Sequence, residues 1–294
     1  MTSTLENKSL VVIGGTSGLG LSAAKAFIAA GAQVVVVGKN PEKIEEAKKT
    51  LGNAAMALAA DATDPKAALA AVQIALKNFG GFHGLYHVAG GSGRRMGDGP
   101  LHELTDEGWE YTLQQNLTSV FLSNRAAIRQ FLEQKSGGAI LNMTSVLGFS
   151  PSPHYFGTHA YATAKAAIIG LTKSLAAYYA AVNIRVNALA PALVATPMSQ
   201  RAQSDAEILD FIGTKQPLDG GRIGDPSDLD AAAVYFMSDA SKFVTGQVLA
   251  IDGGWTVSEG QIPRREAPAQ ATQSQGPTPL ARKLAGLWTK LTRG

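Results

Sequence analysis

Short apolar runs alternate with longer mixed segments along most of the chain. Residues 9–13 and 33–37 are almost wholly apolar, which is typical of parallel strands buried on both faces. The segment between them, 21–30, predicts a helix. The same alternation predicts further strands at 54–60, 82–88, 139–143, 184–190 and 248–251, and further helices at 41–51, 65–79, 105–134, 163–181 and 226–238. Within 105–134 the pattern allows a break near Gly108.

Seven strands alternating with helices predict an α/β fold, a doubly wound parallel sheet of Rossmann type in a single domain. We place this domain at residues 1–257, a flexible linker rich in Pro, Ala, Gln and Ser at 258–279, and a short tail helix at 280–294. Sheets of this kind bind ligands beyond the carboxyl ends of their strands. The functional residues should therefore follow the strands.

Composition narrows the class of protein. Hydrophobic residues make up 45% and charged residues 17% of the 294, which fits a compact fold rather than a disordered chain. The absence of cysteine excludes disulfides, thiol catalysis and zinc–thiolate sites, and we predict no metal site. We find neither a signal-peptide pattern nor an apolar run near the ~18 residues of a membrane span. We therefore expect a cytoplasmic protein.

The net charge of +3 is unevenly distributed. Residues 261–294 hold six basic side chains and one acidic side chain, which leaves 20 basic and 22 acidic residues in 1–260. The main domain therefore gives no reason to expect nucleic acid.

The tail itself predicts a basic amphipathic helix. Its apolar residues recur at helical spacing: Leu280, Leu284, Leu287, Trp288 and Leu291. Residues 280–293 could dock on an anionic membrane surface or an acidic protein, or pack on this subunit or a neighbouring one. The sequence leaves these alternatives open.

A glycine-rich turn directly follows the first predicted strand. Residues 14–20 read Gly-Gly-Thr-Ser-Gly-Leu-Gly and lead into a helix, whose first backbone N–H groups can bind a phosphate. The spacing G-x3-G-x-G differs from the commoner G-x-G-x-x-G fingerprint. A turn used only for packing is the alternative, but the flanking strand and helix favour dinucleotide binding.

The end of the second strand bears on the choice of dinucleotide. NAD-binding units usually carry an acidic residue there for the adenosine ribose, whereas this chain has Gly38 followed by Lys39. A small residue beside a cation leaves room and charge for a 2′-phosphate, which favours NADP over NAD. Lys39 can equally be a solvated turn residue.

Tyr161 and Lys165 stand four residues apart, on one face of a predicted helix. A phenol with a pKa of ~10 is a poor acid or base near neutral pH, and a fixed ammonium nearby lowers that pKa. The pair is a candidate for proton transfer. A surface pair on an alanine-rich helix is the simpler alternative.

Taken together, these residues resemble the short-chain dehydrogenase/reductase family over roughly residues 5–257. The resemblance rests on the order and spacing of Gly14, Gly18, Gly20, Ala89, Gly90, Asn116, Ser145, Tyr161, Lys165, Asn187, Pro191, Thr196, Pro197, Gly246, Gln247, Asp252, Gly253 and Gly254. It implies a nicotinamide cofactor, a small carbonyl or alcohol substrate and a homo-oligomer, either a dimer or a tetramer.

The resemblance also implies roles for individual residues. Tyr161 would be the general acid or base, and Lys165 would lower its pKa, helped by the oxidised nicotinamide, and bind the nicotinamide ribose. Ser145 would hold the substrate oxygen, and Asn116 would hold a water that links Lys165 to solvent. The implied cofactor-binding residues are Gly14, Thr16, Ser17, Gly18, Leu19, Gly20, Gly38, Lys39, Asp61, Ala62, Ala89, Gly90, Gly91, Tyr161, Lys165, Pro191, Val194 and Thr196.

Some residues depart from the family pattern. Ile13 replaces a usual Thr, His87-Val88 replaces Asn-Asn, and Ala192 replaces a Gly. We expect His87 to be a hydrogen-bonded core residue rather than a catalytic one.

Residues 151–159 make the interval from Ser145 to Tyr161 about three residues longer than usual. This loop should border the substrate pocket, with His154, Tyr155 and His159 as candidate specificity residues.

Substrate identity stays open at this stage. By resemblance, 194–221 would cover the pocket, with Met198, Ile208, Phe211 and Ile212 as apolar faces. Arg94 and Arg95 could receive an acidic or phosphate-bearing substrate, or belong to a solvated loop. The sequence thus predicts an NAD(P)-dependent oxidoreductase, with an epimerase or dehydratase and a non-catalytic dinucleotide sensor as the alternatives.

Overall fold

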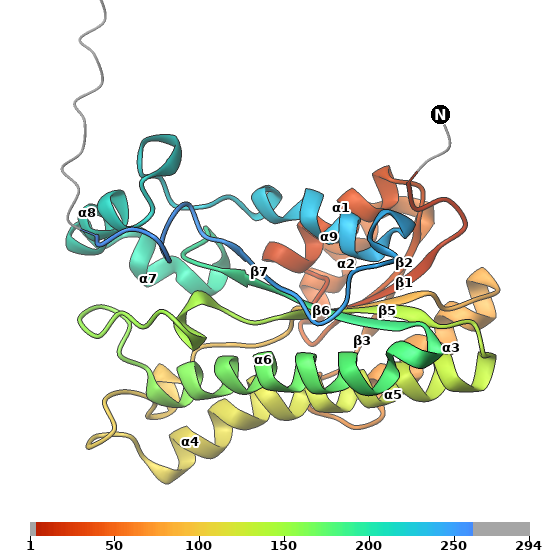
Figure 1. Cartoon of the computed structure of the whole chain (residues 1–294), viewed down its shortest axis with the longest axis horizontal. Coiled ribbons are helices and arrows are strands. Elements are labelled where there is room, and N and C mark those ends of the chain that lie inside the picture. The colour runs from red at the N-terminus through yellow and green to blue at the C-terminus, as the bar shows by residue number, and fades with distance from the viewer. Residues whose placement is uncertain (1–3, 261–294) are drawn as a thin grey trace, which may run out of the picture. The chain divides into compact units, whose positions relative to one another are not determined.

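A seven-stranded parallel sheet forms the centre of the molecule, and the computed structural model describes residues 4–260 (Figure 1). The strand order is β3-β2-β1-β4-β5-β6-β7. The strands are β1 (Ser9–Ile13), β2 (Gln33–Gly38), β3 (Ala55–Ala59), β4 (Gly84–His87), β5 (Gly138–Met143), β6 (Ile184–Pro191) and β7 (Val248–Ile251). The predicted α/β fold with seven parallel strands is confirmed.

Helices cover both faces of the sheet. One layer contains α1 (Gly18–Ala29), α2 (Pro41–Leu51) and α9 (Asp230–Met237), and the other contains α3 (Ala67–Phe79), α5 (Ser119–Gln134) and α6 (His159–Tyr179). Three further helices lie at one end of the sheet in Figure 1: α4 (Asp106–Leu113), α7 (Gln200–Gln203) and α8 (Ala206–Lys215).

Strand β1 shows why runs of apolar residues predicted the strands. Leu10 and Val12 belong to the core on the side of α1, whereas Val11 and Ile13 belong to the core on the side of α3. All four side chains are fully buried, because successive residues of a strand point to opposite faces. A strand covered on both faces must therefore be apolar throughout.

The strand order reverses at β1, which pairs with β2 on one side and β4 on the other. Such a reversal opens a crevice at the carboxyl ends, where α/β sheets bind their ligands. The glycine-rich turn leaves β1 at this point, and the N–H groups of Gly14 and Gly15 donate to the carbonyl of Val37 at 2.9 and 3.0 Å. The turn is thus tied to the end of β2.

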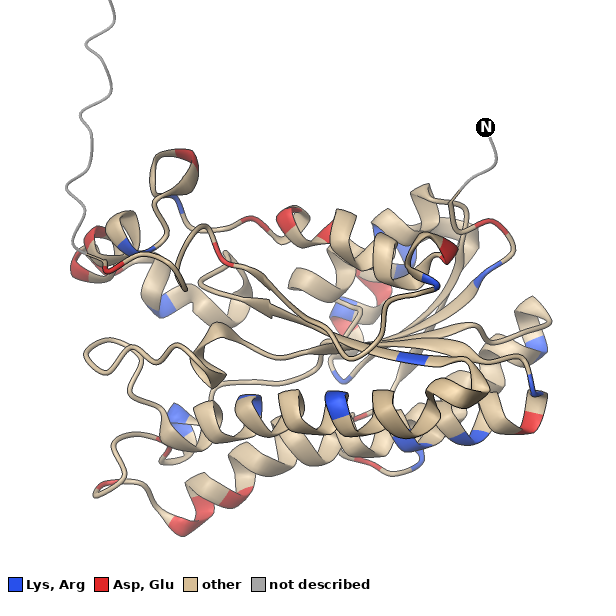
Figure 2. Cartoon of the chain, viewed as in Figure 1, with Lys and Arg blue, Asp and Glu red and all other residues tan. Residues whose placement is uncertain are grey.

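The predicted helix at 105–134 is interrupted in a different place than expected. Thr105 caps α4 by accepting from the N–H of Gly108 at 3.0 Å, so the chain is helical through Gly108. The irregularity is a π-helical turn at Gln114–Thr118, which carries Asn116. Acidic residues lie in the first turn of α4, where the helix dipole favours them (Figure 2).

Other boundaries shift by a few residues. Helix α6 begins at His159, so it carries Tyr161 as well as most of the predicted stretch 163–181, and the predicted helix 226–238 is a 3₁₀ turn, Pro226–Leu229, followed by α9. Within residues 4–260 no helix is long and apolar enough to cross a membrane. The tail predicted at 280–294 and nearly all of the linker lie outside the described residues.

Candidate active site

Four predicted catalytic residues line one cavity of about 110 Å³ at the carboxyl ends of the central strands: Asn116, Ser145, Tyr161 and Lys165. Ser145 follows β5, Tyr161 and Lys165 stand on α6, and Asn116 comes from the π-helical turn. The fold therefore brings together residues that are up to 49 positions apart.

Lys165 is a buried cation. Its side chain is 3% exposed, and Nζ donates to the carbonyl of Met143 at 2.9 Å. Burial lowers the pKa of Lys165 to about 8. Nζ lies 5.4 Å from the centre of the Tyr161 ring, which is consistent with the predicted common face.

The Tyr161 phenol behaves differently from the sequence expectation. Burial raises the pKa of Tyr161 to about 12, and a hydrogen bond with Ser145 acts in the opposite direction. The protein alone therefore does not produce the lowered pKa that the spacing with Lys165 suggested. Burial removes water from the phenolate, and this destabilisation of the charged form is larger than the stabilisation by the hydrogen bond. A neutral phenol can still donate a proton to a reacting oxygen.

Asn116 braces the loop after β4. Its side-chain amide donates to the carbonyls of Gly91 and Thr112, both at 2.9 Å, and its Oδ1 accepts from the N–H of Gly91 at 3.1 Å. Gly90 must be glycine here, since a Cβ would lie 2.7 Å from Asn116 Oδ1. These contacts position the loop, while the predicted water-holding role of Asn116 stays a prediction.

Asp98 is a site residue that the sequence reasoning missed. It is buried, and its two carboxylate oxygens accept from the N–H groups of Ala160 and Tyr161, each at 3.0 Å. The residue at the N-cap position of α6, Thr158, makes no side-chain capping bond. Asp98 therefore replaces it as the cap and holds the backbone of Tyr161.

The residues predicted for the cofactor fall into two groups along the crevice. One group lines the cavity of the catalytic residues: Leu19, Gly90, Gly91, Pro191, Val194 and Thr196. The other follows β2 and β3 and comprises Gly38, Lys39, Asp61 and Ala62. The glycine-rich turn after β1 lies between β2 and β4 in the sheet order, and this arrangement fits an elongated dinucleotide.

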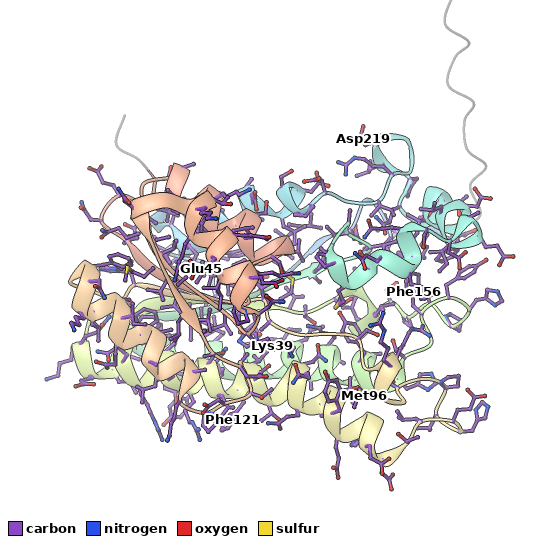
Figure 3. The ribbon with its side chains drawn as sticks, turned by 180° about the vertical axis from the view of Figure 1, so that it is seen from behind. Lys39, Glu45, Met96, Phe121, Phe156 and Asp219 are labelled. Carbon is purple, nitrogen blue, oxygen red and sulfur yellow. The ribbon has the colours of Figure 1, made fainter. Side chains whose placement is uncertain are left out.

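The last residue of the second strand, Gly38, must be small. A Cβ on Gly38 would collide with Oγ1 of Thr16 in the glycine-rich turn, so an acidic side chain cannot be accommodated without movement. Lys39, labelled in Figure 3, is exposed, and its Nζ lies 4.0 Å from Oδ2 of Asp61. Hydrogen bonds from Thr63, together with Lys39, lower the pKa of Asp61 despite its partial burial. The charge of Lys39 is thus shared with a nearby carboxylate.

His87 is the core residue that the sequence predicted. It is fully buried, with Nδ1 2.7 Å from Oγ of Ser123 and Nε2 3.1 Å from the carbonyl of Ala89. Burial, with Lys165 nearby, lowers the pKa of His87 to about 3. A neutral imidazole with both nitrogens bonded is structural.

A larger cavity of about 580 Å³ shares Ser145 and Tyr161 with the first. Its lining includes both apolar and basic residues: Val146, Leu147, Phe156, Pro197, Met198 and Trp255, and Arg94, Arg95 and Arg201. This volume suits a small organic substrate.

The loop 151–159 borders this larger cavity as expected, but through Phe156 and Thr158 rather than the side chains of His154, Tyr155 and His159 (Figure 3 labels Phe156).

The expected cover of the pocket is partly correct. Met198 lines the cavity, whereas Ile208 and Ile212 are buried in a small core with Trp255. The ring of Phe211 packs edge-on against Trp255, with centres 5.7 Å apart. The sequence reasoning did not identify Trp255 or Arg201 as site residues, because no local pattern marks them. Trp255 follows the last strand by only a few residues.

Comparison with known proteins agrees with this geometry. A family model described as Enoyl-(Acyl carrier protein) reductase matches residues 14–256. The chain is 36% identical over 255 residues to 2,5-dichloro-2,5-cyclohexadiene-1,4-diol dehydrogenase of Sphingobium indicum, covering 86% of this chain and 99% of the relative. It is 34% identical over 248 residues to cis-4-hydroxycyclohexanecarboxylate dehydrogenase of Sinomonas cyclohexanicum, covering 84% and 95%.

A solved short-chain type dehydrogenase/reductase from Mycobacterium ulcerans superposes with a TM-score of 0.78 at 30% identity, covering 87% of this chain and 92% of the other. The chain belongs to the short-chain dehydrogenase/reductase family. It is accordingly an NAD(P)-dependent oxidoreductase that acts on a small molecule.

Proposed function

We propose that this enzyme transfers a hydride between NADP(H) and a carbonyl or secondary alcohol, with Tyr161 as general acid in reduction and general base in oxidation. The observation that carries the proposal is that Ser145 and Tyr161 line both cavities. A substrate oxygen at that shared wall meets two hydroxyl groups, and its carbon faces the crevice that suits the cofactor. Both relatives named above are called dehydrogenases of hydroxyl-bearing six-membered rings.

The polar residues of the site then have distinct roles in the reaction. Ser145 donates a hydrogen bond to the substrate oxygen and stabilises the charge that develops there. Tyr161, whose phenol is neutral, protonates that oxygen during reduction. Lys165 holds the nicotinamide ribose and supplies a positive charge beside Tyr161. The bound nicotinamide supplies or accepts the hydride.

The preference for NADP rests on Gly38 and Lys39. Gly38 brings no negative charge to the place where an acidic residue would repel a 2′-phosphate, and the exposed ammonium of Lys39 can pair with that phosphate. The nearby Asp61 is available to the adenine side of either cofactor.

The test is a panel of ketones and aldehydes assayed with NADPH and with NADH, following the absorbance of the reduced cofactor. We expect turnover with a higher kcat/KM for NADPH, and we expect Lys39→Gln to narrow the difference between the cofactors. A clear preference for NADH would contradict the role of Lys39. A product formed without net change in reduced cofactor would favour an epimerase or dehydratase, and binding without turnover would favour a sensor.

The assembly and the tail belong to the same proposal. We propose a dimer or tetramer, supported by the exposed apolar side chains Trp109, Phe121 and Leu132 on α4 and α5. Truncation after Gly260 tests the predicted division at residue 257 and the docking of residues 280–293. Unchanged catalysis, oligomer size and membrane partition in the truncated enzyme would remove the docking role.

A further inference from the structure

Three arginines face the substrate cavity from two different parts of the chain. Arg94 and Arg95 come from the loop after β4, and Arg201 comes from α7. All three residues are exposed to solvent, and they line the cavity together with Ser145 and Tyr161. The sequence singled out Arg94 and Arg95 but gave no reason to join them with Arg201.

Arg94 and Arg201 converge on a single oxygen. The Nη2 atoms of both side chains donate to the main-chain carbonyl of Tyr155, each at 3.1 Å. The two guanidinium groups are therefore held within a few ångströms of each other by one neutral acceptor. Tyr155 lies in the loop whose extra length departs from the family pattern, so this loop builds the pair.

The pair lacks a compensating negative charge. Among residues 4–260, no ion pair joins either guanidinium to a carboxylate. Asp98 is the acid that acts on Arg94 electrostatically, but both of its oxygens accept from the backbone at the start of α6. Partial burial of its guanidinium and, to a smaller extent, the positive charge of Arg201 lower the pKa of Arg94.

This local positive charge stands out against its surroundings. Residues 1–260 hold fewer basic than acidic side chains, yet three basic side chains meet at one cavity. Each guanidinium group carries further N–H donors besides the one given to Tyr155, and such donors match the oxygens of a carboxylate or a phosphate. The apolar wall of Phe156, Met198 and Trp255 leaves space for a hydrocarbon body in the same cavity.

We propose that Arg94 and Arg201 form a subsite for an anionic group, a carboxylate or a phosphate, on the substrate whose carbonyl or alcohol carbon lies against Tyr161. The assignment rests on the proposed oxidoreductase function. The anion displaces neither catalytic hydroxyl, and it fixes the far end of the substrate so that the reacting oxygen reaches Ser145. Arg95 adds positive charge to the same side of the cavity.

The test compares pairs of substrates in which one member carries an anionic group and the other does not. One matched pair is 4-oxocyclohexanecarboxylate and its methyl ester, and the other is dihydroxyacetone phosphate and dihydroxyacetone. For at least one pair we expect the charged member to have a kcat/KM at least about tenfold higher, mainly through KM, which corresponds to about 1.4 kcal/mol. The pair that shows the preference distinguishes a carboxylate from a phosphate. The preference should fall as ionic strength rises.

Variants separate recognition from loop structure. Arg94→Gln combined with Arg201→Gln should remove most of the charge preference, because the kcat/KM of the charged member falls far more than that of the neutral member. Arg201→Lys keeps the positive charge at residue 201 but loses the guanidinium donors, and it should retain part of the preference. Arg129→Gln, an exposed arginine on α5 that lines neither cavity, is the matched control and should change nothing.

Three results would overturn the proposal. Neutral members reduced as well as charged ones in the wild type would refute the anion subsite while leaving the oxidoreductase function intact. A preserved charge preference in the double glutamine variant would show that the arginines only hold the loop. Absence of hydride transfer to any carbonyl would contradict the proposed function itself, and the subsite would fall with it.

Discussion

Replacing Lys165 by methionine should change how the stability of the protein depends on pH. Burial lowers the pKa of Lys165 from 10.5 to about 8 in the folded protein. Between these values the unfolded chain binds a proton at this side chain that the folded chain has lost. Since stability rises with pH wherever the unfolded state binds more protons, Lys165 makes the wild type gain stability as pH rises from about 8 to about 10.5.

The size of this gain follows from the shift. Each pKa unit corresponds to about 1.4 kcal/mol, which gives about 3 kcal/mol over the whole window and about 2 kcal/mol between pH 8 and pH 10. Methionine has a similar length and does not titrate. The free energy of unfolding of Lys165→Met, relative to wild type, should therefore decrease by about 2 kcal/mol from pH 8 to pH 10.

The assay is urea unfolding at the two pH values, with stability extrapolated to water. Lys173→Met is the matched control, because Lys173 lies two turns further along α6 and is exposed. Its difference from wild type should be the same at both pH values. If the difference between Lys165→Met and wild type were also independent of pH, the buried-cation reasoning would be refuted.

Two further predictions concern residues that shape the site. Asp98→Ala leaves the N–H groups of Ala160 and Tyr161 unpaired and should lower the free energy of unfolding by about 2–4 kcal/mol, with a fall in kcat, whereas Asp98→Asn keeps one acceptor and should lose less. Equal urea-unfolding curves for Asp98→Ala and wild type would contradict the capping role. Gly38→Asp should raise the Kd for NADPH at least about tenfold, through charge repulsion and collision with Thr16. If a fluorescence titration gave the same NADPH Kd for Gly38→Asp and wild type, the 2′-phosphate would not approach residue 38.

Much of the fold could be predicted because it has local causes. A strand covered on both faces, such as β1, needs an unbroken apolar run, and the turn from β1 to α1 needs small residues at defined positions. Tyr161 was identified from its spacing to Lys165, and Ser145 from the family resemblance. Each directly follows a strand or begins a helix at the carboxyl end of the sheet, where this architecture places its site.

The remaining features depend on contacts between distant segments. Asp98 caps α6 from 62 residues away, and Arg201 meets Arg94 only because both reach the carbonyl of Tyr155. The sequence predicted a lowered pKa for Tyr161, whereas in the protein without cofactor this pKa is raised. Helical spacing reveals the neighbouring ammonium but not the burial of the phenol. Such effects require the tertiary structure.

The role of Tyr161 as proton donor is the central claim, and Tyr161→Phe tests it most directly. The variant loses only the hydroxyl, so its NADPH Kd should stay near that of wild type while kcat for carbonyl reduction falls by ~10²–10⁴. Tyr178→Phe, at an exposed position on the same helix, is the matched control and should keep full activity. A Tyr161→Phe enzyme that binds NADPH and reduces the carbonyl at a rate close to that of wild type would contradict the account.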